Sequence, residues 1–568
     1  MATRRTTTKA KAKANPKAKA KGKPKAAKAK TKPKGAKPKA RPKSKPKTAS
    51  KAKAKSRGDK VSVRIRMYRQ GLGDCFLLTF QQQGKEDFNM MVDCGLLQGT
   101  RNSTEIMKQV VENVESTLSV SRKIDGEQKK WLDVVVLTHE HADHISGFGQ
   151  AQDIFNRIHF GEVWAGWMDD ESHPKYKAVR ERFHKQVTGL RAALARMKSD
   201  AQQGLKETVT HLLEDFFDEN VLGVEDNVLG AKATKTKRTP AWEFALNKSV
   251  KDPRFCRPGS MFTLPGFDDI RIYILGPSEN YDDFTKVDPS EEDTYRSEGS
   301  GFALADSFFA AVAEDSDLFD AELRQPFENH LRIDADVRAK EHDFFKTHYG
   351  FDEQTPDPSG KKDPNAWRRI NDDWLSMAGS LALKLDSYTN NTCLAFAIEF
   401  VSSQKVLLFP GDAQFSNWLS WQELTWQIPD EKGVKQEVKA EHLLNRTVFY
   451  KVGHHGSHNA TLKKHGLEMM ISPELMAMIP VDRAKAESKV TKTNPKGWEM
   501  PEKNLFTRLQ ERTRGRVLLA DEKDDKKLKV RCNDSNFLKK VKFDGSLARD
   551  AANPTAKEPI AVELIIEG

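Results

Sequence analysis

The chain lacks both the long apolar segments of a membrane protein and the cysteine pattern of a secreted one. No stretch approaches the roughly 18 apolar residues of a membrane span, and no apolar signal-peptide core follows the basic N-terminus. The five cysteines are odd in number and widely spaced, at positions 75, 94, 256, 393 and 532. This spacing excludes a CxxC zinc module and argues against a disulfide framework. We therefore expect a cytoplasmic protein whose thiols are buried.

Acidic, aromatic and branched aliphatic residues are all missing from the first 57 residues. This segment holds 24 of the 94 Lys and Arg residues, so the remainder has 70 basic and 81 acidic side chains despite the overall charge of +13. A segment with nothing to bury cannot offset its ordering entropy, so residues 1–57 are expected to be a disordered Lys/Ala/Pro-rich basic tail. The tail resembles those of linker histones and is expected to bind nucleic acid or another polyanion by releasing counterions, with nucleoid DNA as one such partner in a cell. A solubilising extension is the alternative.

Four metal-binding side chains gather within six residues after an apolar run. Residues 134–137 read Val-Val-Val-Leu, and the motif His139-x-His141-x-Asp143-His144 follows. Imidazoles and carboxylates at this density cannot all enter an apolar core, and they are typical ligands of zinc and related ions. The alternative is a strand-to-helix turn whose polar side chains merely hydrogen-bond to one another. We interpret the motif as a metal site.

Five further segments accompany this motif in a characteristic order along the chain. The set is Gly71-Leu72-Gly73-Asp74-Cys75, Val92-Asp93-Cys94-Gly95, the HxHxDH run, Asn390-Asn391-Thr392, Gly411-Asp412 and Gly453-His454-His455-Gly456-Ser457. In this order the segments resemble the metallo-β-lactamase superfamily, and in particular its ComEC-type branch, the hydrolase domain of bacterial DNA-uptake proteins. The resemblance spans roughly residues 60–524 and is interrupted by long insertions.

The resemblance implies an α/β fold, an αββα sandwich in which helices cover two packed sheets. Residues 58–524 are expected to form this metallo-β-lactamase-like domain, with helical insertions at about 171–250 and 278–386. Residues 525–568 are expected to form a C-terminal β extension.

Hydrophobic periodicity locates the elements of this fold. Strands are predicted at 61–67, 76–80, 90–92, 131–137, 154–164, 261–264, 270–275, 393–400, 406–409, 448–452, 476–480, 516–520 and 560–566. Helices are predicted at 105–117, 179–197, 205–216, 302–319, 367–383 and 504–511. The helices of the first insertion would either pack on the sandwich or form a lid or dimer surface. Residues 225–250 are interpreted as a linker.

Ligand type divides the histidine motif between two divalent metal ions. His139 and His141 offer imidazoles to one ion, while Asp143 and His144 offer a carboxylate and an imidazole to the second. Zinc is the first expectation for such mixed ligands, and manganese is the alternative.

Later segments complete the site by resemblance. Asp412 would bridge the two ions, His455 would be a ligand and His454 would move protons, although the order of the two histidines stays open. Asp93 is expected to orient the ligand loops rather than to coordinate. Catalytic roles are therefore expected for Asp143, Asp412 and His454.

Two positions depart from the superfamily pattern. Asn391 lies in the segment where most members have a histidine that completes the first metal site. An amide oxygen is a weak zinc ligand, so Asn391 is expected beside the ligands, and the ion at His139 and His141 would be looser or depend on Asp412. Met500 precedes a proline where the branch usually has a histidine, which removes one candidate for substrate contact or proton transfer.

Metal binding lowers the pKa of water to about 7 and so supplies a hydroxide that attacks phosphorus or a carbonyl carbon. We therefore expect a metal-dependent hydrolase. The ComEC-type motifs and the basic tail favour a phosphodiesterase or nuclease. The alternatives are a nucleoid or DNA-binding protein whose sandwich is a scaffold, and a hydrolase of non-phosphate esters or lactones.

Overall fold

The computed structural model describes residues 60–180, 238–280, 378–429, 433–490, 496–550 and 555–568, with isolated positions at 190, 194, 206, 209–210, 293, 343–344 and 348. All of these residues belong to one compact unit, Lys55–Gly568. The basic tail, the helix predicted at 302–319 and most of those predicted at 179–197, 205–216 and 367–383 lie outside the described residues.

The first strands and the end of the chain build a nine-stranded sheet, here called sheet A. Its order is β17 (Val541–Asp544), β20 (Ala561–Glu567), β1 (Ser62–Tyr68), β2 (Cys75–Gln81), β3 (Phe88–Cys94), β5 (Glu127–Val136), β6 (Ile158–Gly166) and β7 (Arg254–Cys256), and β4 (Ser121–Ile124) pairs with β5. β1, β2 and β3 are antiparallel, whereas β3, β5 and β6 run parallel. The carboxyl ends of β3 and β5 therefore meet at one edge of the sheet.

The middle of the chain builds a seven-stranded sheet, here called sheet B. Its order is β16 (Val517–Leu519), β15 (Met476–Ile479), β14 (Thr447–Lys451), β11 (Lys405–Phe409), β10 (Ala395–Phe400), β9 (Phe267–Gly276) and β8 (Met261–Leu264). β11, β14, β15 and β16 are parallel, so the segments that follow β11 and β14 leave the sheet at the same edge. Two small pairs stand apart, β12 (Thr425–Pro429) with β13 (Lys435–Lys439) and β18 (Leu547–Ala548) with β19 (Lys557–Glu558).

The two sheets pack face to face through alternating side chains. Val63, Ile65 and Met67 of β1 are fully buried and share one hydrophobic core with Phe396 and Ile398 of β10. Because residues two apart on a strand point to the same face, this core marks the inner faces of both sheets.

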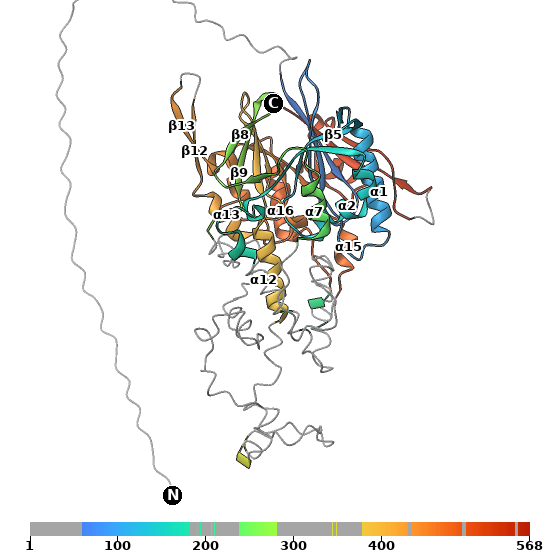
Figure 1. Ribbon diagram of the computed structural model, residues 1–568, viewed down its shortest axis with the longest axis vertical. Helices are drawn as coiled ribbons and strands as arrows, with labels where there is room; N and C mark the ends of the chain where they lie inside the picture. Colours follow the sequence, from blue (N-terminus) through green and yellow to red (C-terminus); the bar gives the residue numbers. More distant parts are fainter. Residues whose placement is uncertain are drawn as a thin grey trace, which may run out of the picture. The chain divides into compact units, whose positions relative to one another are not determined.

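Helices cover the outer faces. Outside sheet A, a second core contains α1 (Ser103–Thr117), α2 (Ala142–Gln150), α3 (Gln152–Phe155) and α7 (Pro240–Asn247). Outside sheet B, a third core contains α12 (Ala378–Asn391), α13 (Phe415–Trp421), α14 (Ala440–Asn445) and α16 (Lys503–Thr513). In Figure 1, α1 and α2 flank β5 on the side away from β8 and β9. The predicted sandwich of two sheets between helices is thereby confirmed.

One predicted strand is partly wrong. The sequence predicts a strand over 154–164, but α3 continues to Phe155 and β6 begins at Ile158. A short apolar run does not by itself distinguish a buried helix turn from a buried strand.

The predicted linker at 225–250 is also corrected, because it contains α7. Pro240 occupies the first turn of this helix, and the Thr239 hydroxyl accepts a hydrogen bond from the Trp242 backbone N–H at 3.3 Å. Threonine before proline is a helix start that the reading of this segment as a linker overlooked.

The C-terminal segment completes sheet A. β20 pairs antiparallel with both β1 and β17, while α17 (Lys526–Arg531) and α18 (Ser535–Leu538) add Leu528 and Phe537 to the core between the sheets. A last short helix, α15 (Arg483–Glu487), follows β15. The boundary at residue 525 stays a prediction, but the last strand lies inside the sheet rather than beside it.

The structure bears on two features discussed from the sequence, the state of the cysteines and the long apolar segments. All five cysteines are buried free thiols, so their predicted burial is confirmed. Among the described helices, none combines the length and apolar character that crossing a membrane requires.

Leu564→Ala is expected to lower the free energy of unfolding by about 2–4 kcal/mol, because Leu564 of β20 is fully buried between the sheets. Ile565→Ala is the matched control, since this next residue is 44% exposed on the opposite face and its truncation should cost less than about 1 kcal/mol. Urea unfolding followed by tryptophan fluorescence measures both. Equal losses would contradict the observed register of β20.

Candidate metal centre

The polar motifs converge where four segments leave the two sheets. Asp93 ends β3, the HxHxDH motif follows β5, Asp412 follows β11, and His454 and His455 follow β14. Asp143 and His455, which are 312 residues apart, approach within 2.9 Å. The parallel pairing of β3 with β5 and of β11 with β14 therefore builds the site.

Asp93 anchors the segment that carries the histidine motif. Its carboxylate accepts hydrogen bonds from the Thr138 backbone N–H at 2.8 Å and from the Thr138 hydroxyl at 2.6 Å. It also lies 2.8 Å from His144 Nδ1. Gly95 lets α2 approach, because a Cβ at this position would lie 2.2 Å from the Asp143 carbonyl carbon. The carboxylate expected to orient the ligand loop thus contacts both the loop and one of its histidines.

The other ring nitrogen of His144 faces the centre of the site. Nε2 lies 3.1 Å from Asp412 Oδ2 and 3.7 Å from Asp143 Oδ2. A carboxylate on Nδ1 fixes the orientation of a metal-binding histidine in this way. Burial opposes protonation of His144, but the carboxylates of Asp412 and Asp74 outweigh it and hold its pKa well above the ordinary value. The positive charge of protonated His144 therefore offsets part of the negative charge of these carboxylates, as a bound divalent ion would.

His139 and His141 turn ring nitrogens toward each other. His139 Nε2 lies 3.0 Å from His141 Nδ1. Burial lowers the pKa of His139 well below its ordinary value and that of His141 to about 3, so both rings are neutral and offer lone pairs. His141 Nε2 lies 3.9 Å from Asp386 Oδ1 of α12. Burial raises the pKa of Asp386 well above its ordinary value, so a neutral carboxyl group lies beside this nitrogen of His141.

Asp412 occupies the position between the two sheets. Its Oδ1 accepts hydrogen bonds from Lys451 Nζ at 3.0 Å and from the His454 backbone N–H at 2.8 Å. Its own backbone N–H donates to Cys393 Sγ at 3.2 Å. These contacts fix the carboxylate so that Oδ2 faces His144.

The paired histidines lie in a strained turn. His454 and His455 have φ values of 46° and 55°, a left-handed conformation that is costly for residues with a Cβ and concentrates at functional sites. His455 Nδ1 donates to the Pro480 carbonyl at 2.6 Å, which directs Nε2 to Asp143 at 2.9 Å. Burial lowers the pKa of His454 to about 4. The geometry favours His455 as the ligand and His454 as a neutral imidazole near Asp412.

Three groups of three buried side chains could each hold a metal ion. The groups are His139, His144 and Asp412; Asp143, Asp412 and His455; and Asp74, Asp93 and His144, with ligand atoms within 4.8 Å of one another in each. Asp412 is common to the first two, which suits the bridging role predicted from the sequence. In these groups His139 would share a metal ion with His144, whereas ligand type alone predicts that it shares one with His141. The division of ligands between the ions stays a prediction.

The charge of the cluster fits divalent cations. Five carboxyl groups are buried at the site, those of Asp74, Asp93, Asp143, Asp386 and Asp412, and burial raises the pKa of Asp74 and of Asp386. Lys451 is the one Lys or Arg that forms an ion pair with any of them in the described part of the chain. Asp143 Oδ1 finds no hydrogen-bond donor among the described residues, and Asp412 Oδ2 meets the His144 imidazole at 3.1 Å; buried carboxylate oxygens with so few donors are costly. Mixed imidazole and carboxylate donors suit zinc or manganese, so the residues fit the expected ions.

Asn391 lies at the end of α12, outside the three ligand groups. Its Oδ1 accepts a hydrogen bond from the Asn417 backbone N–H at 3.3 Å, and its carbonyl accepts one from Asn417 Nδ2 at 3.0 Å. These bonds hold α12 against α13. Asn391 therefore positions the helix end beside the ligands.

Three residues contact the candidate ligands although no such contact was predicted from the sequence: Lys451, Asp74 and Asp386. Lys451 contacts both Asp74 and Asp412, and these two carboxylates overcome burial and raise its pKa. A lysine inside an apolar strand is a signal that identifies such a residue. Asp74 belongs to the segment Gly71-Leu72-Gly73-Asp74-Cys75, whose sequence by itself does not indicate an ion pair. Asp386 lies in α12, one turn before the Asn390-Asn391-Thr392 segment, but a single aspartate in a helix is no local signal of a metal site.

Residues 68–219 match the family model of the metallo-beta-lactamase superfamily. The matched part of the chain contains the HxHxDH motif and is similar to a metallo-β-lactamase domain. A search of curated proteins finds no match. The family match and the buried His/Asp groups support a metal-dependent hydrolase with divalent ions as cofactor. Asp412 and His455 lie beyond the matched residues, and the structure brings them to the motif.

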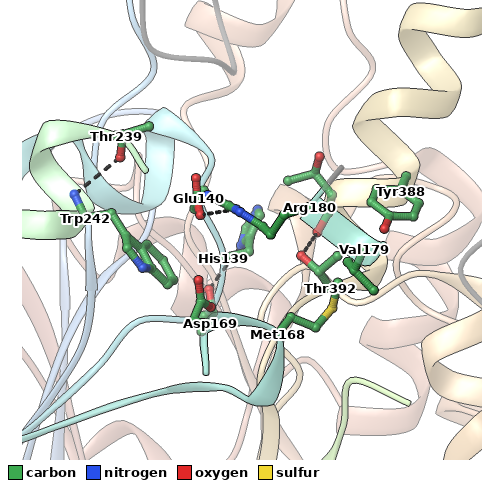
Figure 2. A pocket seen from close by; sticks show the side chains of 12 residues that line it. His139, Glu140, Met168, Asp169, Val179, Arg180, Thr239, Trp242, Tyr388 and Thr392 are labelled. Carbon is green, nitrogen blue, oxygen red and sulfur yellow. Dashed lines mark hydrogen bonds and ion pairs between the residues drawn. The ribbon is translucent and has the colours of Figure 1, made fainter. Parts of the chain in front are cut away.

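A pocket of about 50 Å³ adjoins the metal centre, with His139 in its wall. Figure 2 shows Arg180 reaching toward Glu140, and the two are 2.6 Å apart, Nη1 to Oε1. Asp169 lines the same pocket, and its Oδ1 lies 3.6 Å from Arg238 Nε. Burial, with Glu140 nearby, raises the pKa of Asp169 to about 7. This carboxyl therefore changes charge near neutral pH.

Asp386→Leu is expected to weaken zinc binding about tenfold or more, because it removes the carboxyl group that lies 3.9 Å from His141 Nε2 and could hydrogen-bond to that ring once a metal ion is bound. Leucine is close to aspartate in shape and suits a buried position. Chelator competition on the purified protein measures the affinity. Asp153→Leu changes an exposed carboxylate on α3 and should leave the affinity unchanged. Wild-type affinity in Asp386→Leu would exclude this positioning role.

Asp169→Asn should remove the decrease in the free energy of unfolding that occurs when the buried Asp169 carboxyl ionises as pH rises. The folded pKa of about 7 lies above the unfolded value of 3.8, so this carboxyl makes the fold less stable as pH rises from about 4 to 7, and no further above that. The stability of the variant relative to wild type should therefore increase from pH 5 to pH 8, on the order of 2 kcal/mol. Urea unfolding at the two pH values measures the difference. A constant difference would show that Asp169 titrates normally.

Proposed function

We propose that the chain is a metal-dependent phosphodiesterase that cleaves nucleic acid, a nuclease similar to the ComEC-type branch. The observation that carries this proposal is the shared Asp412, which belongs to two of the three groups of candidate ligands. Paired metal sites that share a carboxylate suit displacement at phosphorus, where charge develops on both the attacking and the leaving oxygen.

Bound divalent ions would supply Lewis acidity and a water molecule with a pKa near neutrality. The protein supplies the arrangement around them. Lys451 keeps Asp412 ionised, and Asp93 orients His144. Burial keeps His454 neutral, so its imidazole would accept a proton from the attacking water and return it to the leaving-group oxygen.

Two features of the sequence support nucleic acid as the substrate. The six motifs follow the order of the ComEC-type branch, including Asn391 in place of a histidine. Residues 1–57 carry 24 basic and no acidic side chains, which favours attraction of a polyanion to an otherwise acidic chain. Manganese or zinc would serve this chemistry, because both accept imidazole and carboxylate ligands.

A second candidate is a DNA-binding protein in which the sandwich is only a scaffold, and the charge of the tail favours it. The buried carboxylates argue against it. Five such groups around the site are costly to fold around, and a scaffold without chemistry would gain nothing from them.

Asp143→Ala should reduce metal-dependent turnover of DNA, RNA and bis-p-nitrophenyl phosphate by about a hundredfold or more, because it removes a carboxylate of the second ligand group. Assays with zinc and with manganese on the full-length protein measure this. Asp153→Ala, an exposed carboxylate, is the matched control. Wild-type turnover no higher than that of Asp143→Ala on all three substrates would refute the proposal, and turnover of lactones alone would favour an ester hydrolase.

Deletion of residues 2–57 separates the two candidates in the same assays. If the tail only brings an enzyme to its substrate, the truncated protein loses DNA binding but keeps turnover of bis-p-nitrophenyl phosphate. Less than one bound metal ion per chain, with DNA binding confined to the tail, would favour the scaffold.

A further inference from the structure

The pocket beside His139 is built mainly by residues outside the metal centre. Arg180 follows β6 in the first insertion, Trp242 lies in α7 and Tyr388 lies in α12. Figure 2 shows Trp242 and Tyr388 on opposite sides of the pocket, with Arg180 and His139 between them. Met168 also lines it. Three segments distant in sequence thus enclose a space next to the candidate ligands.

Two hydrogen-bond donors of residues that line this pocket have no acceptor among the described residues. Trp242 is 1% exposed, and its Nε1 has no hydrogen-bond partner among the described residues. Arg180 bonds to Glu140 through Nη1, while its Nε finds no acceptor in the same part of the chain. Buried donors without acceptors cost free energy and in native proteins call for a specific explanation. Both donors line one pocket, so a single ligand with several acceptor oxygens would satisfy them.

The charges of the pocket admit an anion. Glu140 is paired with Arg180, and Asp169 lies near Arg238. Because the pKa of Asp169 is raised to about 7, this carboxyl is partly neutral at physiological pH. Arg238 has Glu171 as a further partner at 3.9 Å, whereas Arg180 meets Glu140 through Nη1 and keeps Nε available to an incoming anion.

We propose that this pocket binds a phosphoryl group of the substrate, with Arg180 and the Trp242 indole N–H as donors to its oxygens. The inference rests on the proposed function and deepens it by assigning residues that hold the substrate. The planar guanidinium matches phosphate oxygens, and the position beside His139 places a bound phosphoryl group next to the metal centre.

The remaining walls favour this ligand. Met168 and Val179 are buried apolar side chains, 7% and 3% exposed, that limit water in the pocket. Hydrogen bonds to an anion are stronger where water is excluded. A space of about 50 Å³ suits a compact polar group rather than a nucleobase. The rest of a polymeric substrate would extend outside the pocket.

The test is isothermal titration of full-length, zinc-loaded protein with inorganic phosphate, and with acetate as a carboxylate probe. Arg180→Gln should raise the Kd for phosphate at least about tenfold, because it removes a charged donor. Trp242→Phe keeps an aromatic ring but removes the indole N–H together with the rest of the five-membered ring, and it should raise the Kd about threefold to tenfold. Arg157→Gln and Trp131→Phe are the matched controls, since their donors bond to Glu115 and Asp133 outside the pocket.

Unchanged phosphate affinity in both pocket variants, or an equal loss of acetate affinity, would overturn the inference. Thermal melting of each variant identifies any loss that comes from unfolding, and Trp242→Phe keeps the test valid if Arg180→Gln does not fold. Turnover of bis-p-nitrophenyl phosphate on the same samples separates the two proposals. Turnover by wild type with unchanged phosphate binding in the variants overturns only the pocket. Weakened binding in the variants without wild-type turnover of any phosphodiester supports the pocket and overturns the proposed function.

Discussion

The contacts of the Asp412 carboxylate join the two sheets at the site. Asp412 follows β11 of sheet B, while His144, 3.1 Å away, begins the helix that follows β5 of sheet A. Lys451 and the His454 backbone N–H hold its other oxygen. Each half of the sandwich supplies an incomplete ligand set, so the site exists only when the sheets pack in one arrangement. The apolar core between the sheets is what sets that arrangement.

This concentration of acids has an energetic consequence. Burial of several carboxylates opposes folding, and in the structure His144, His455 and Lys451 offset part of that cost through ion pairs. Divalent ions would replace the protons on the two histidines and neutralise more of the charge. Metal binding and stability of the fold are therefore linked, because ions that bind only the folded state shift the equilibrium toward it.

The predictions that succeeded rest on local patterns. Strict alternation along β1 and the apolar run before His139 predicted strands, and the fixed order of six motifs predicted the sandwich. Those that failed involved segments where local signals conflict, as at 154–164, or where a helix start was read as a linker, as at α7. Asp386 was missed because its part in the site comes only from the 3.9 Å approach of His141.

By itself the sequence determined the chemistry available, because side-chain type and short-range spacing are local properties: imidazoles and carboxylates at 139–144, a second set at 412 and 454–455, and a basic tail. Only the tertiary structure decided which of them meet. It grouped His144 with His139 and Asp143 with His455, directed Nε2 of His455 inward through Pro480, and enclosed Trp242 and Arg180 in a pocket beside them. Those relations depend on strand order and helix packing across hundreds of residues, and spacing along the chain does not encode them.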